Sequence, residues 1–69
     1  MKEFISRLTK LRMEAAAAGT EAVALAGIYG HDLEFIGLEL METALKMDEM
    51  LSLATALWQK QMNAERNNA

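Results

Sequence analysis

The apolar residues of this chain recur at alternating steps of four and three positions through almost its whole length. In the first half this stripe consists of Phe4, Leu8, Leu11, Ala15, Ala18, Ala22, Leu25 and Tyr29. In the second half it consists of Leu33, Ile36, Leu40, Ala44, Met47, Leu51, Ala54, Trp58 and Met62. The spacing is that of a helix with one packing face, and no proline interrupts it. We therefore expect an all-α protein with two long helices, over about residues 2–29 and 33–65.

A stop signal and a start signal for helices meet in the segment AGIYGHDLEF, residues 26–35. Gly30 can adopt the left-handed conformation that closes the carboxyl end of a helix. Asp32 is placed to accept amide hydrogens at the start of the next helix, where the helix dipole also favours Glu34. A connection this short folds the second helix back on the first. The prediction is an antiparallel two-helix hairpin forming a single domain over residues 1–69, with its bend at residues 30–32.

A glycine inside the first helix leaves a second possibility open. Gly19 followed by Thr20 could end one helix and cap another, which would give a kink or a three-helix variant. The apolar stripe passes Gly19 without a change of phase, and this favours one helix. The small residues nearby let a neighbouring helix approach closely, so that larger side chains fill the space. The small residues are Ala15, Ala18, Gly19, Ala22 and Ala26, and the candidates to fill the space are Met41, Met47 and Leu51.

The second helix carries more apolar side chains than one neighbouring helix can cover. Leu38, Met41 and Leu45 lie on one side of its stripe, and Phe35, Met50, Leu53 and Leu57 lie on the other. A lone domain of this size is marginally stable, and without cysteine it has no disulfide to support it. We expect a homodimer with a four-helix arrangement, in which Leu38, Met41 and Leu45 form the interface or a second contact.

Charge is divided unevenly along the chain. Residues 1–12 carry four bases against one acid, whereas residues 14–49 carry eight acids against Lys46 alone. Folding the hairpin brings Lys60 and Arg66 to the basic end and leaves the bend acidic. An acidic end with embedded apolar residues suits a basic protein surface, such as that of a DNA-binding host factor. We expect the partner-binding residues to be Tyr29, His31, Glu34, Phe35 and Glu39.

Catalysis needs convergent groups, and the sequence places few together. His31 with Asp32 and Glu34 matches no closed metal-ligand spacing, and the serines lie far from His31 along the helices. We expect no enzymatic activity, cofactor or metal. The basic beginning is interrupted by charges and no uncharged apolar run could span a bilayer, so we expect a cytoplasmic protein.

Binding of nucleic acid is the alternative function from a different class. Small dimeric helical hairpins can bind paired RNA loops, and such a protein would regulate RNA pairing. Phosphate contact requires clustered lysines and arginines, which only the two ends of this chain offer. Dimerisation doubles the acids together with the bases, which disfavours this alternative.

In its size, alanine-rich first helix, Gly30-centred bend and long second helix rich in methionine and leucine, the whole chain resembles a known group of proteins. These are the small helical hairpins that bacteriophages make to disable host regulators, in particular the phage anti-activators of quorum sensing. The resemblance implies an inhibitor of transcription regulation, dimeric and located in the host cytoplasm. It would bind the DNA-binding domain of a LuxR-type activator, and the type IV pilus assembly ATPase is a second target. The group offers no motif to align, so no functional residue is carried over.

Overall fold

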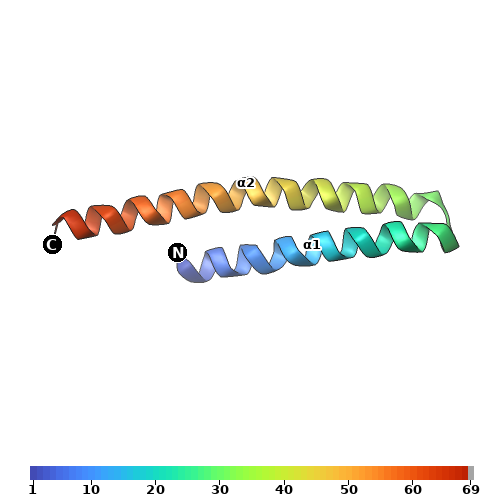
Figure 1. The fold of residues 1–69 in the computed structure, drawn as a ribbon, viewed down its shortest axis with the longest axis horizontal. Helices are drawn as coiled ribbons and strands as arrows, with labels where there is room; N and C mark the ends of the chain where they lie inside the picture. Colours follow the sequence, from blue (N-terminus) through green and yellow to red (C-terminus); the bar gives the residue numbers. More distant parts are fainter. Residues whose placement is uncertain (69) are drawn as a thin grey trace.

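Two helices account for the fold, which a computed structural model describes for residues 1–68 (Figure 1). Helix α1 spans Lys2–Tyr29 and helix α2 spans His31–Asn68, with Gly30 alone between them. The helices run antiparallel and side by side, and the Cα atoms fill a rod of 60 × 15 × 10 Å. The described residues contain no strand. The prediction of an all-α helical hairpin is confirmed.

Both helices are continuous, but their bounds differ in part from those expected. α1 passes through Gly19 without a break, so the three-helix variant is wrong. α2 begins at His31, two residues earlier than expected, and ends at Asn68, three residues later. It has 38 residues against 28 in α1, and its carboxyl end extends past the amino terminus (Figure 1).

The helices meet along seven layers, each made by one residue of α1 and one of α2. Every residue of these layers is buried or half-buried. Yet alanine supplies the most buried side chains of the described chain, Ala22, Ala44 and Ala54. The hairpin therefore has a thin core that leaves its large side chains partly open. From the open end to the bend the layers are Ile5/Ala54, Leu8/Leu51, Arg12/Met47, Ala15/Ala44, Gly19/Leu40, Ala22/Gly37 and Ala26/Leu33.

The sequence stripe predicts the core of α2 better than that of α1. In α2 seven of the nine stripe residues are buried or half-buried; Ile36 and Met62 are exposed. In α1 only four of eight are, and Phe4, Leu11, Ala18 and Tyr29 are exposed instead. The seam of α1 keeps Leu8, Ala15 and Ala22 of the stripe. At its other positions it uses the residue that follows the stripe residue: Ile5, Arg12, Gly19 and Ala26.

Two glycines bring the helix backbones into close approach near the bend. A Cβ atom on Gly37 would lie 2.8 Å from the Gly19 carbonyl oxygen and 2.7 Å from Cγ2 of Val23. A Cβ atom on Gly19 would lie 3.1 Å from the Gly37 carbonyl oxygen and 3.1 Å from Cγ of Met41. The close approach expected at Gly19 is thus present, with Met41 against it as predicted. Gly37, the second glycine of this contact, was not identified from the sequence. We name the close approach of Gly19 and Gly37 the glycine crossing.

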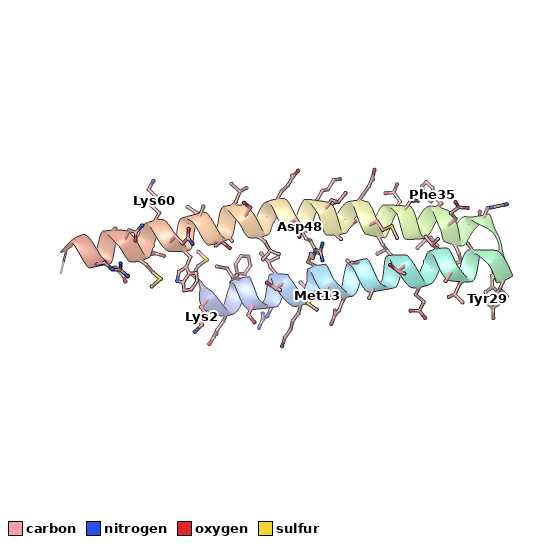
Figure 2. All side chains as sticks on the ribbon, in the orientation of Figure 1. Lys2, Met13, Tyr29, Phe35, Asp48 and Lys60 are labelled. Carbon is pink, nitrogen blue, oxygen red and sulfur yellow. The ribbon has the colours of Figure 1, made fainter. Side chains whose placement is uncertain are left out.

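One ion pair links the helices near the middle of the rod (Figure 2). The Arg12 guanidinium donates from Nε to Asp48 Oδ1 at 2.8 Å and from Nη2 to Oδ2 at 3.2 Å. Both side chains are more than a third exposed, so water screens the pair and its contribution to stability is about 0–1 kcal/mol. Its two-point geometry adds a directional contact between the helices at this position.

Replacing Gly37 by alanine tests the glycine crossing. The added methyl group would press on the Gly19 backbone, which cannot rotate away as a side chain would, so Gly37→Ala should destabilise the fold by about 1–3 kcal/mol. Gly27→Ala is the matched control. It lies in the same hairpin with no atom within 4 Å of its Cβ position, and it should stabilise α1 by about 0.5–1 kcal/mol. Urea denaturation at one fixed protein concentration measures both; equal midpoints for the two variants would contradict the crossing.

Candidate functional site

Gly30 alone reverses the chain direction. Its φ is 121° and its ψ is 170°, a combination essentially restricted to glycine. Its N–H donates to the Ala26 carbonyl at 3.0 Å and closes α1, while its own carbonyl accepts from the Leu33 N–H at 3.2 Å and opens α2. The sequence predicted the left-handed conformation here; φ is positive as expected, but a ψ of 170° lies outside that conformation, so this detail of the prediction is wrong. Because no other residue intervenes, the last residue of α1 and the first of α2 both lie at the tip of the rod.

The polar residues at the bend do not form the arrangement expected from the sequence. Asp32 lies inside the first turn of α2, and no capping hydrogen bond from its side chain is present among the described residues, so its predicted capping role is wrong. Asp32 and Glu34 both lie in the first turn of α2, where the positive end of the helix dipole favours carboxylates. His31 approaches Glu34, with 3.4 Å between Nδ1 and Oε2, and its side chain is 98% exposed. Within residues 1–68 no three ligand-type side chains gather closely enough to hold a metal ion.

The two aromatic residues expected to bind a partner lie on different sides of the rod. Tyr29 ends α1 and is 75% exposed, whereas Phe35 lies on α2 and is 65% exposed. Figure 2 shows Phe35 on the outer side of α2, away from α1, and Tyr29 on the α1 side of the bend. The structure therefore does not bring the two rings together into one anchor.

The other predicted contact residues share the outer side of α2 with Phe35. At helical spacing, His31, Glu34, Phe35, Leu38 and Glu39 occupy neighbouring positions that point away from the seam. All five are exposed. We name these five residues the acidic tip. It combines two large apolar side chains with two carboxylates on rigid helix.

The structure places the three residues predicted for a dimer interface in two different environments. Met41 is half-buried against Gly19 and belongs to the hairpin. Leu38 and Leu45 are exposed and lie seven residues apart on the outer side of α2. The glycine at position 19 explains the difference, because the space it leaves receives the Met41 side chain.

A larger apolar surface combines residues of the predicted stripe with others, such as Met50 and Leu57, that were expected beside it. On one flank of the seam, both helices present uncharged residues at each heptad position. Phe4, Leu11, Ile36, Met50 and Leu57 there are 45–59% exposed. The absence of charge at these spacings is the signal that identifies them. We name this surface the open apolar face; it consists of Phe4, Leu11, Ala18 and Leu25 on α1 and Ile36, Thr43, Met50 and Leu57 on α2.

The hollows of the described surface are shallow. Each is lined by successive turns of one helix and is open to solvent: Glu3, Ser6, Arg7 and Lys10 on α1, and Gln59, Met62, Asn63 and Arg66 on α2. Neither helix, over the described residues, is long and apolar enough to cross a membrane. Two exposed patches of the described surface, the acidic tip and the open apolar face, gather large apolar side chains at helical spacing.

Comparison with known protein families, with curated proteins and with solved structures gave no match.

The bend can be tested by removing the conformational freedom of Gly30. Alanine disfavours a φ of 121°, so Gly30→Ala should destabilise the hairpin by about 1–3 kcal/mol, although its Cβ would meet no atom within 4 Å. The loss would come from the backbone alone. Urea denaturation at fixed concentration measures it, with Gly27→Ala as the control of the same chemistry at an ordinary helical position. An unchanged midpoint for Gly30→Ala would contradict this account of the bend.

Proposed function

We propose that this protein is a non-enzymatic inhibitor that binds a regulatory protein through its acidic tip. The observation that carries the proposal is the exposure of Phe35 and Leu38 beside Glu34 and Glu39 on one side of α2. Large apolar side chains in such a setting are typical of binding surfaces. Because they project from a continuous helix, little conformational entropy is lost when a partner covers them.

The spacing and the charge of the tip define the partner that it fits. Phe35, Leu38 and Glu39 stand at the i, i+3 and i+4 positions that a helix uses when it docks into a groove. Phe35 would be the anchor, and the carboxylates would steer a basic surface towards it. Residues 13–45 carry six acids and neither lysine nor arginine, so the field around the tip has one sign.

A DNA-binding domain is a basic surface of this kind. We propose a transcription activator as the target class, and the resemblance to phage anti-activators makes a LuxR-type quorum-sensing activator the first protein to test. The type IV pilus assembly ATPase is the second. The carboxylates of the acidic tip, bound over the basic residues with which the activator contacts DNA phosphates, would compete directly with DNA.

We also propose that two hairpins dimerise into a four-helix arrangement. The isolated hairpin exposes 5602 Å². A compact monomer of its mass would expose about 4,300 Å², so the excess is about 1,300 Å². A stable interface of standard size covers about 800 Å² on each partner. The excess is therefore large enough for a second copy and leaves area for a target.

Two substitutions at the tip test the proposed function. Binding to the purified DNA-binding domain of a LuxR-type activator is measured by calorimetry, and displacement of its DNA by gel shift. Phe35→Ala should weaken binding about tenfold or more because it removes the anchor, and Glu39→Lys should slow association by reversing a steering charge. Met13→Ala is the control, since Met13 is 60% exposed on α1 away from the tip and should change nothing. Equal binding by all three variants would contradict the role of the tip.

Affinity capture from nuclease-treated lysate separates this proposal from the RNA-binding alternative. Protein captured by the wild type and lost with Phe35→Ala would survive nuclease treatment. If the captured material is instead nucleic acid that nuclease removes, and Lys10→Ala abolishes its capture while Phe35→Ala does not, the proposed function is wrong.

A further inference from the structure

We propose that a second copy of this chain docks on the open apolar face in antiparallel orientation, with the bend of each hairpin beside the open end of the other. The open end is the part of the rod formed by residues 2–12 and 55–66. The inference rests on the dimer proposed above. It adds which face is covered, which orientation the copies take and which surfaces stay free.

The face has the continuity that a helix-bundle interface requires. Its eight positions repeat every seven residues on both helices, and none carries a charge. From Phe4 to Leu25 it runs for about 32 Å along α1. The opposite flank of the seam includes Lys2 and Asp48, and Asp48 pairs there with Arg12 of the seam. A second hairpin docked on that flank would bury charged side chains away from water. A second hairpin docked on the open apolar face would bury none.

The size of the side chains favours the antiparallel orientation. In the register of the hairpin, the face is built from four pairs: Phe4/Leu57, Leu11/Met50, Ala18/Thr43 and Leu25/Ile36. Antiparallel docking sets the large pair Leu11/Met50 against the small pair Ala18/Thr43 of the other copy in both central layers. In the two outer layers Phe4/Leu57 meets Leu25/Ile36. Parallel docking would set each pair on itself. Two Ala18/Thr43 pairs would then leave a void while two Leu11/Met50 pairs crowd each other.

The distribution of charge favours the same orientation. The open end carries six bases, Lys2, Arg7, Lys10, Arg12, Lys60 and Arg66, against Glu3 and Glu65. The bend half, residues 13–45, carries six acids and no base of lysine or arginine type. Antiparallel docking brings the basic end of each copy alongside the acidic half of the other. Parallel docking would gather like charges at both ends of the dimer, which costs free energy.

This geometry leaves the outer side of α2 uncovered. The two bends then lie at opposite ends of the dimer, about 45 Å apart, because each bend is about 15 residues from the symmetry axis, and the acidic tips are about 35 Å apart. One dimer would thus present two separate tips to partners.

The orientation can be measured by distances between spin labels, because the chain has no cysteine and a single introduced cysteine labels one site. For Asp32→Cys, the antiparallel dimer should give a label separation of about 45 Å, whereas a parallel dimer would give about 20 Å or less. Lys46→Cys is the control. Lys46 lies near the proposed symmetry axis, so its labels should be within about 30 Å in either orientation. A short Asp32 separation would overturn the orientation and leave the dimer standing.

The face can be tested by charge substitution and sedimentation. Leu11→Glu and Met50→Glu should each raise the dimer dissociation constant at least 100-fold, because each buries a carboxylate against apolar side chains. Leu45→Glu is the control, being a leucine 64% exposed on the outer side of α2, and should change the constant less than threefold. Met50→Ala is a milder variant, with an expected increase of about tenfold, and circular dichroism reports whether each variant keeps its helices.

The outcomes separate the two proposals. A wild-type chain that sediments as a monomer at 100 µM overturns the dimer and this inference together, but not the role of the acidic tip. Dissociation by Leu45→Glu with tolerance of Met50→Ala and Met50→Glu overturns the face and retains the dimer. Loss of target binding with Phe35→Ala, while the dimer persists, supports the separation of the two surfaces.

Discussion

The close approach of two helix backbones is the constraint on which the rest of this structure depends. Gly19 and Gly37 allow the crossing, and Ala22 and Ala44 continue the thin seam beside it. Small residues there leave little volume between the helices, so large apolar side chains are displaced to the flanks. The same feature that packs the hairpin tightly therefore leaves many of its large apolar side chains exposed.

Two surfaces of different chemistry result from this arrangement. The open apolar face is uncharged and spans both helices, as a surface for another hairpin should be. The acidic tip lies on the outer side of α2, where Phe35 and Leu38 stand among carboxylates. Because the two surfaces point in different directions, a dimer can form through one while the other remains available. The proposed dimer and the proposed partner would thus use separate surfaces of one 69-residue chain.

Helix content and the position of the bend were predictable because local chemistry decides them. Gly30 is the residue at which the backbone must take positive φ, and propensity favours helix on both sides. The face of each helix was harder to assign. In α2 most of the stripe is core, but in α1 Phe4 and Leu11 belong to the open apolar face. An apolar stripe marks the centre of all the apolar surface of a helix, including side chains that do not contact the other helix. It does not mark the centre of the contact between the two helices. The residues of the tip are all exposed, but the pattern of the sequence did not decide this in advance. The separation of Tyr29 from Phe35 depends on the single-residue bend.

The sequence by itself determined the two helices, their reversal at Gly30, and the division of charge between a basic open end and an acidic bend, because propensity, backbone freedom and charge belong to individual residues. Only the tertiary structure decided that Gly37 completes the crossing with Gly19, that Arg12 pairs with Asp48, and that Met41 turns inward while Leu38 stays out. These depend on the register and rotation of one helix against the other. Shifts of a single residue change both, and the heptad pattern is compatible with more than one such alignment.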